Sequence, residues 1–249
     1  MKVIRKWKRW LAVSCSHGHL ANAAACKAAI EMKRRWIRSG DTTMHLGDAV
    51  DLAALRAGAM RDPNATDRSA SIREDFDAGI NFLRELHPTH FWAGNHEDRL
   101  YSMQNSPSAI VAHCATSAIA ELMSAMKEMR TKVTQYDIEK GWVDFGGTLF
   151  GHGYMFNESA VRDHVEMLRR PVVFGHLHRI DRAAGRCIGA PVGWSIGCLA
   201  DIGSMHYARR NRSVTRWAHG IAYGEYVDGG EGCTVNVVSP VEGEWRLPI

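Results

Sequence analysis

The chain has 249 residues, of which 45% are hydrophobic and 23% are charged, so a disordered or fibrous protein is excluded. Its formal net charge of +4 is too small to indicate nucleic-acid binding by itself. Its six cysteines include no Cys-x-x-Cys pair, which argues against a zinc knuckle or a disulfide scaffold and favours free thiols.

The spacing of apolar residues predicts strands that alternate with helices over the first two thirds of the chain. In chain order we expect a strand at residues 10–14, a helix at 21–38, a strand at 42–46, a helix at 69–86, a strand at 89–93, a helix at 107–129, a hairpin at 142–150, a helix at 158–168 and a strand at 171–175. Residues 187–249 are expected to be β-rich. This order predicts one α/β domain over residues 1–249, with a helical insertion at about 100–130.

Two features bear on localisation. A basic N-terminus leads into the apolar residues 10–13 and resembles a secretory signal, but Ser14, Ser16 and His17 interrupt the apolar stretch and argue against one. The longest stretch without Asp, Glu, Lys or Arg, residues 100–120, contains several polar residues and predicts no membrane span. We therefore expect a soluble, cytoplasmic protein.

The 13 histidines point to metal binding or acid–base chemistry. Five segments that follow predicted strands combine glycine with imidazole, carboxylate, amide or thiol groups: Cys15-Ser16-His17-Gly18, Gly47-Asp48-Ala49-Val50-Asp51, Gly94-Asn95-His96-Glu97, Gly151-His152-Gly153 and Gly175-His176-Leu177-His178. Ligands bind at the C-terminal ends of strands in open α/β sheets, so these segments are expected to meet. Mixed His, Asp and Asn ligands suit Zn²⁺, Mn²⁺ or Fe²⁺. Each segment alone is a common turn, but together they predict a dinuclear metal site.

The five segments resemble the motifs of the calcineurin-like metallophosphoesterase superfamily, which are Asp-x-His, Gly-Asp-x-x-Asp, Gly-Asn-His-Glu/Asp, His-Gly and Gly-His-x-His. The match covers residues 15–178, and four of the five motifs match fully. The resemblance implies a four-layer αββα sandwich, in which two β-sheets are flanked by helices. Residues 94–100 also resemble phage and prophage members of the superfamily.

The resemblance also implies residue roles. One ion would be held by Cys15, His17, Asp48 and His178, and the second by Asp48, Asn95, His152 and His176, with Asp48 as the bridge. His96 would lie beside the substrate phosphate and donate a proton to the leaving group. Asp51 is expected either to orient His96 or a metal ligand, or to cap a loop. Glu97 and Asp98 are expected to cap a helix that begins near His96.

Two divalent ions, Zn²⁺, Mn²⁺ or Fe²⁺, would neutralise a phosphate ester and convert a shared water into the attacking hydroxide. The sequence therefore predicts a phosphoesterase, with phosphodiester or nucleic-acid substrates favoured over monoesters. The alternatives are a phosphomonoesterase or protein-phosphatase-like enzyme and a non-catalytic scaffold with this fold. A basic run, Arg209, Arg210, Arg212 and Arg216, could contact nucleic acid or form a solvated surface.

Cys15 departs from the family pattern, which has aspartate at this position. A thiolate is a softer ligand than a carboxylate and favours Zn²⁺ or Fe²⁺ over Mn²⁺. The sequence resembles RNA-lariat debranching enzymes here, which also carry cysteine and remain active. Cys15 is therefore expected to be either a metal ligand or a small buried residue at a strand end.

Overall fold

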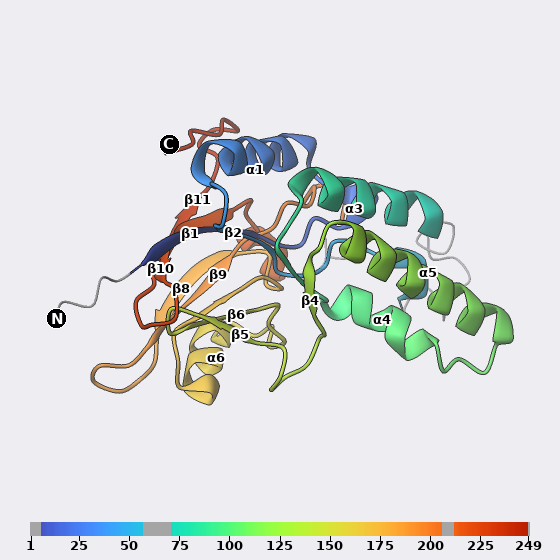
Figure 1. Ribbon diagram of the computed structural model, residues 1–249. Coiled ribbons are helices and arrows are strands. Elements are labelled where there is room, and N and C mark those ends of the chain that lie inside the picture. Colours follow the sequence, from blue (N-terminus) through green and yellow to red (C-terminus); the bar gives the residue numbers. More distant parts are fainter. Residues whose placement is uncertain (1–5, 57–70, 206–211, 249) are drawn as a thin grey trace.

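Residues 6–56, 71–205 and 212–248 are described by the computed structural model, which confirms the expected α/β architecture. It contains two mixed β-sheets (Figure 1). The six-stranded sheet has the order β11 (Asn236–Val238), β10 (Ile221–Val227), β1 (Trp7–Val13), β2 (Thr42–His45), β3 (His90–Trp92) and β4 (Lys132–Thr134). The five-stranded sheet has the order β5 (Val143–Phe145), β6 (Thr148–Gly151), β7 (Val172–Phe174), β9 (Val192–Ile196) and β8 (Ile180–Ala184).

The central strands of both sheets are parallel, and this determines where the motif segments lie. Strands β1, β2, β3 and β4 pair in parallel, as do β6, β7 and β9. Parallel strands end at the same edge of a sheet, so the segments after β1, β2 and β3 meet at one edge, and those after β6 and β7 meet at another. The two sheets pack face to face through a buried core that joins Trp10, Met44 and Trp92 to Phe150 and Val173.

Helices cover the outer faces of both sheets. Helices α1 (Ala23–Trp36) and α3 (Ile72–Leu86) lie above the six-stranded sheet in Figure 1, and α6 (Ala160–Leu168) lies below the five-stranded sheet. Helices α4 (Asn95–Met103) and α5 (Ala109–Glu128) form the right-hand end of the molecule in that view. Within the described ranges, short 3₁₀ helices are η1 (Gly18–Leu20), η2 (Ala53–Leu55) and η5 (Arg212–Arg216).

Local sequence signals explain where the helices begin. The side chain of Asn22 accepts the amide of Ala25 at the start of α1, and Ser71 accepts the amide of Glu74 at the start of α3. The helix expected at residues 69–86 therefore begins at Ile72, and residues 69 and 70 lie outside the described part of the chain. The expected hairpin is confirmed as β5 and β6, joined by Gly146 and Gly147.

A helix that begins near His96 was expected and is α4, although its length was not predicted, and strand β4 was not predicted at all. Helix α4 begins inside the Gly94–Glu97 motif, where glycine and polar residues obscure its apolar face. Strand β4 has only three residues, too few for alternation to be recognised.

Among the described helices, α5 alone is long and apolar enough to cross a membrane, with a mean hydropathy of 1.4. Its inner face packs Ile119, Leu122 and Met126 into a core shared with α3, whereas Ile110 is 77% exposed. One helix of this kind carries little weight, since core helices pass the same test. The expectation that no segment spans a membrane stays a prediction.

His164 of α6 is buried and gives the fold a pH-dependent stability. Its Nδ1–H donates to the carbonyl of Ala160 at 2.6 Å, while Nε2 accepts the amide of Tyr154 at 3.2 Å. A protonated ring would turn Nε2 into a donor that faces another donor. Burial lowers the pKa of His164 from 6.5 to about 4.

The imidazole of His164 binds a proton more readily in the unfolded chain than in the folded one. Its titration should therefore lower the free energy of unfolding as the pH falls from 6.5 to about 4. The loss is full below that window and amounts to about 3 kcal/mol at most. Denaturant unfolding at pH 7 and pH 4.5 should show a smaller pH effect in His164→Gln than in the wild type. His113→Gln, on the exposed face of α5, is the control. Equal pH effects in His164→Gln and the wild type would show that His164 does not resist protonation.

Candidate metal centre

The seven candidate ligands lie together where strands from the two sheets end. Cys15 and His17 follow β1, Asp48 follows β2, and Asn95 follows β3. His152 follows β6, and His176 and His178 follow β7. Ligands from the six-stranded sheet therefore face ligands from the five-stranded sheet.

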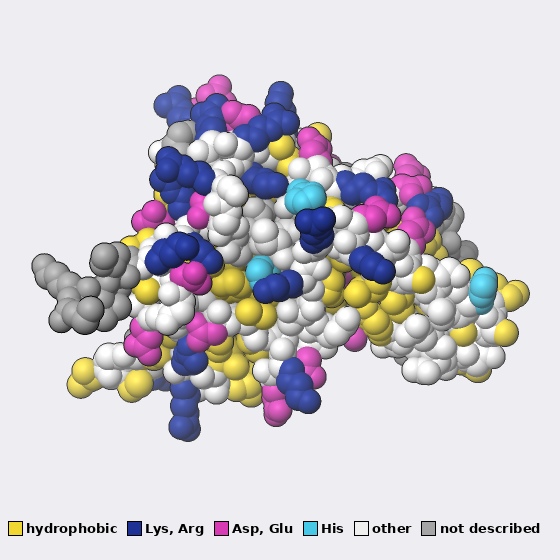
Figure 2. All heavy atoms as spheres, viewed as in Figure 1, with side chains coloured by type: hydrophobic (Ala, Val, Ile, Leu, Met, Phe, Trp, Pro, Cys, Tyr) yellow, Lys and Arg dark blue, Asp and Glu magenta, His cyan; other side chains and the backbone are white. Residues whose placement is uncertain are grey.

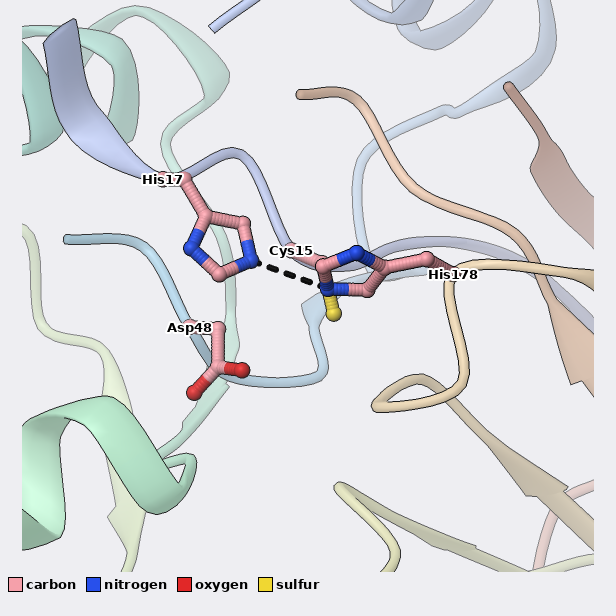
Figure 3. A group of neighbouring side chains, drawn as sticks. All are labelled: Cys15, His17, Asp48 and His178. Atoms are coloured by element: carbon pink, nitrogen blue, oxygen red, sulfur yellow. Dashed lines mark hydrogen bonds between the residues drawn. The ribbon is translucent and has the colours of Figure 1, made fainter. Parts of the chain in front are cut away.

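The first group consists of Cys15, His17, Asp48 and His178, all buried, with one ligand atom of each within 4.8 Å of the others. Figure 3 shows the rings of His17 and His178 facing each other, with the side chains of Cys15 and Asp48 beside them. The Nε2 atoms of His17 and His178 face each other at 3.0 Å. A thiol, a carboxylate and two imidazoles in this arrangement form a donor set suited to zinc or iron.

The second group consists of Asp48, His152 and His176, whose ligand atoms also lie within 4.8 Å of one another. Asn95 completes it: its Oδ1 lies 3.0 Å from Nε2 of His152 and 2.9 Å from Nδ1 of His176. The carboxylate of Asp48 is 3.3 Å from Nε2 of His152. Asp48 thus belongs to both groups and lies between them.

Hydrogen bonds outside the two groups orient two of the imidazoles. Nδ1 of His17 lies 2.9 Å from Oδ1 of Asp51, and Nδ1 of His152 donates to the carbonyl of Leu46 at 2.6 Å. In each ring Nε2 is left facing the other ligands. Metal-binding histidines are typically held in this way by a carboxylate or a carbonyl on the opposite ring nitrogen.

Burial and mutual charge determine the protonation of the centre. Burial and the neighbouring His152 lower the pKa of His176 to about 3, so this ring is neutral and able to bind a cation. Burial would raise the pKa of Asp48, but His152 and His96 lower it well below its usual range. Burial, followed by the charge of Asp48, raises the pKa of the Cys15 thiol. A bound cation would oppose that rise, because coordination deprotonates a thiol.

Backbone strain is concentrated at this centre. Among the described residues, left-handed φ angles between 52° and 59° occur at six non-glycine positions in or beside the motif segments: Cys15, His17, Asp48, Leu52, His176 and His178. Such conformations are costly for residues other than glycine and cluster at functional sites. At Gly47, with φ +94°, an added Cβ would lie 2.5 Å from Nδ1 of His152, so glycine is needed for close approach.

His96 lies beside the two groups. Its Nδ1 donates to the carbonyl of Asp51 at 2.5 Å, and its Nε2 is 3.9 Å from Asp48. The imidazole meets that of His17 edge to face, with ring centroids 4.6 Å apart. The amide of His96, in the first turn of α4, donates to Oδ1 of Asp48 at 3.0 Å, so the positive end of this helix faces the shared carboxylate.

Asp51, which was expected to orient His96 or a metal ligand or to cap a loop, contacts both His96 and the candidate ligand His17. Its carboxylate binds His17 at 2.9 Å and lies 3.4 Å from Nδ1 of His96. The closer partner of His96 is the carbonyl oxygen of Asp51. The Asp51 carboxylate is therefore placed first of all to orient a candidate metal ligand.

Glu97 does more than cap α4. Its carboxylate accepts the amide of Gly94 at 2.7 Å, which is the expected capping contact. It also accepts the amides of Asp48, Ala49 and Val50 at 2.9, 2.7 and 3.2 Å. One buried carboxylate thus holds the backbone of the loop that carries Asp48.

Sequence reasoning missed several side chains that border the centre. Trp217 packs on His178 with ring centroids 4.4 Å apart, and Tyr136 lies 5.9 Å from His152. Arg99 donates to the carbonyl of Asp51 at 2.9 Å, which places a cation near His96. Asp75, which lies on α3, accepts the backbone amides of Asp51 and Leu52. Only Asp75 carried a detectable signal, since a carboxylate interrupts the apolar face of the predicted helix.

The basic run lies only partly within the described residues. Arg209, Arg210 and His206 lie outside the described residues, whereas Arg216 forms an ion pair with Glu158 at 3.2 Å. Figure 2 shows Lys and Arg side chains mixed with acidic ones over the top of the molecule, around α1 and α3. A contact with nucleic acid stays a prediction.

Comparison with known proteins finds distant likenesses among solved structures. No protein-family model and no curated protein sequence matches the chain. A NAD nucleotidase from Haemophilus influenzae aligns with 98% of this chain and 54% of its own, at 8% identity and a TM-score of 0.43. The chain therefore spans about half the length of that enzyme. A protein of unknown function from Aquifex aeolicus aligns with 68% of this chain and 78% of its own, at 14% identity and a TM-score of 0.34. Likenesses of this size do not by themselves establish a shared function.

Proposed function

We propose that this protein is a metal-dependent phosphoesterase of the calcineurin-like metallophosphoesterase superfamily, with one domain built as a four-layer αββα sandwich. The observation that carries the proposal is the convergence of six ligand-type side chains on the shared Asp48. The positions of α1 and α3 on one sheet and α6 on the other support the sandwich.

The residues present fit a pair of divalent ions. Cys15, His17, Asp48 and His178 would hold one ion, and Asp48, Asn95, His152 and His176 the other. The Nε2 atoms of His17 and His152 are oriented toward the other ligands, and the neutral ring of His176 is in the protonation state that metal binding requires. Ions held there would neutralise the phosphate and supply the nucleophile at neutral pH.

His96 would handle the proton of the leaving group. Burial lowers the pKa of His96 to about 4, and with Nδ1–H donated to Asp51 the neutral ring presents an unprotonated Nε2 to the centre. The negative charge of a phosphate ester beside Nε2 would raise this pKa and let the ring carry a proton to the leaving oxygen. Arg99 adds a positive charge that favours an anionic substrate.

The test compares bis-p-nitrophenyl phosphate with p-nitrophenyl phosphate as substrates in the presence of Mn²⁺, Zn²⁺ or Fe²⁺. We expect metal-dependent hydrolysis, faster for the diester, and its loss in Asp48→Asn. Faster hydrolysis of the monoester would favour a phosphomonoesterase. Metal binding without hydrolysis of either ester would contradict the proposal and favour a non-catalytic scaffold.

Cys15 is expected to set the metal preference of the first group. A Cys15→Asp variant replaces soft sulfur with hard oxygen, so its activity with Mn²⁺ relative to Zn²⁺ should rise. Aspartate also tolerates the left-handed backbone at this position, where φ is 54°. Cys15→Ser should weaken the first group and leave the second largely occupied. Titrations of the wild type and both variants with Mn²⁺ and Zn²⁺ test this, and identical metal profiles would show that Cys15 is only a packing residue.

A further inference from the structure

Asp75 stands outside every motif, yet its carboxylate is 1% exposed and directed at the backbone beside the centre. It accepts the amide of Leu52 at 2.7 Å and that of Asp51 at 3.1 and 3.2 Å to its two oxygens. A third partner, Nδ1 of His19, lies 3.1 Å away. Helix α3 thereby ties the segment after β1 to the segment after β2.

Asp51, whose amide Asp75 binds, also contacts two histidines of the centre. The side chain of Asp51 orients His17, and the carbonyl of Asp51 accepts Nδ1–H of His96. The amide of Asp51 is bound by Asp75. The amide, the carbonyl and Oδ1 of Asp51 are thus all hydrogen-bonded, and the amide is bound by the carboxylate of Asp75.

Gly18 provides independent evidence that the segment after β1 packs tightly against Asp75. It has φ +52°, and a Cβ there would clash with Oδ1 and with the carbonyl oxygen of Asp75. The segment that carries His17 can therefore approach Asp75 only with glycine at this position.

We propose that Asp75 is a positioning residue that sets the affinity of the first metal group through Asp51 and His17. The proposal rests on the function proposed above and adds that His17, which belongs to the first group alone, is oriented by a support that the second group does not share. Glu97 holds the loop of Asp48, and the carbonyl of Leu46 orients His152. Neither of these supports passes through Asp75, so the second group should not depend on it.

The test measures metal bound per chain by elemental analysis after dialysis at a series of Zn²⁺ concentrations. Asp75→Asn keeps the shape but places an NH₂ group against amide donors, so affinity for the first ion should fall by ~10–100-fold. The second ion should bind as in the wild type. Gly18→Ala should reproduce this pattern by displacing Asp75. Asp77→Asn, two residues further on the exposed face of α3, should leave both affinities unchanged.

The outcomes separate the two proposals. A wild type that binds no Zn²⁺ would overturn the proposed function itself. A wild type that binds two ions, together with an Asp75→Asn variant that binds both equally well, would overturn only the role of Asp75. Recovery of the first ion at high Zn²⁺ is expected, because a positional defect is overcome by mass action. Circular dichroism that matches the wild type, with equal weakening of both ions, would also contradict the proposal.

Discussion

Replacing His96 with alanine is expected to lower turnover by ~10²–10⁴-fold, the usual contribution of a general acid, while leaving the metal content unchanged. The ring of His96 packs on the candidate ligand His17 but belongs to neither group. Its Nδ1 is bound to the carbonyl of Asp51, and its Nε2 is 3.9 Å from Asp48. The loss should shrink for esters with good leaving groups, which depart without a proton.

The measurement is kcat for a series of aryl phosphodiesters of rising leaving-group pKa, together with metal analysis of each protein. His176→Ala provides the contrast, because it should lose metal as well as activity. Loss of metal in His96→Ala, or an equal effect across the series of esters, would contradict the role given to His96.

Replacing Glu97 with glutamine should both destabilise the protein and abolish most activity. The Glu97 carboxylate accepts four backbone amides, two at each oxygen. Glutamine offers one oxygen, so two buried amides would face an NH₂ group, at a cost of about 2–5 kcal/mol. Denaturant unfolding of Glu97→Gln against Asp98→Asn, a partly exposed neighbour in the same helical turn, measures this. Equal stability of the two variants would show that the loop of Asp48 does not depend on Glu97.

Much of the centre could be anticipated because chemistry and topology agree in this chain. Glycine-flanked polar residues followed predicted strands, and parallel strands bring such segments to common edges. The resemblance in the motifs, rather than the topology, then implied that Asp48, Asn95 and His152 are neighbours, and these three side chains do lie together although they come from both sheets.

The supports of the centre were harder to anticipate, because they depend on three-dimensional packing. Glu97 carries a sequence signature of a helix cap, and nothing in its spacing shows that it also binds Ala49 and Val50. The approach of Trp217 to His178 depends on how the chain returns after β9. Local patterns do not encode such long-range contacts, and for Asp75 they show a carboxylate on the apolar face of a helix but not the amides that it binds.

Each candidate ion would be held jointly by the two sheets. The first group takes Cys15, His17 and Asp48 from one sheet and His178 from the other, and the second is divided in the same manner. An ion bound only when the sheets are docked stabilises the docked state by mass action, by ~2.7 kcal/mol at 100 times its dissociation constant. The concentration of free metal would thus change the stability of the packing between the two sheets as well as the activity.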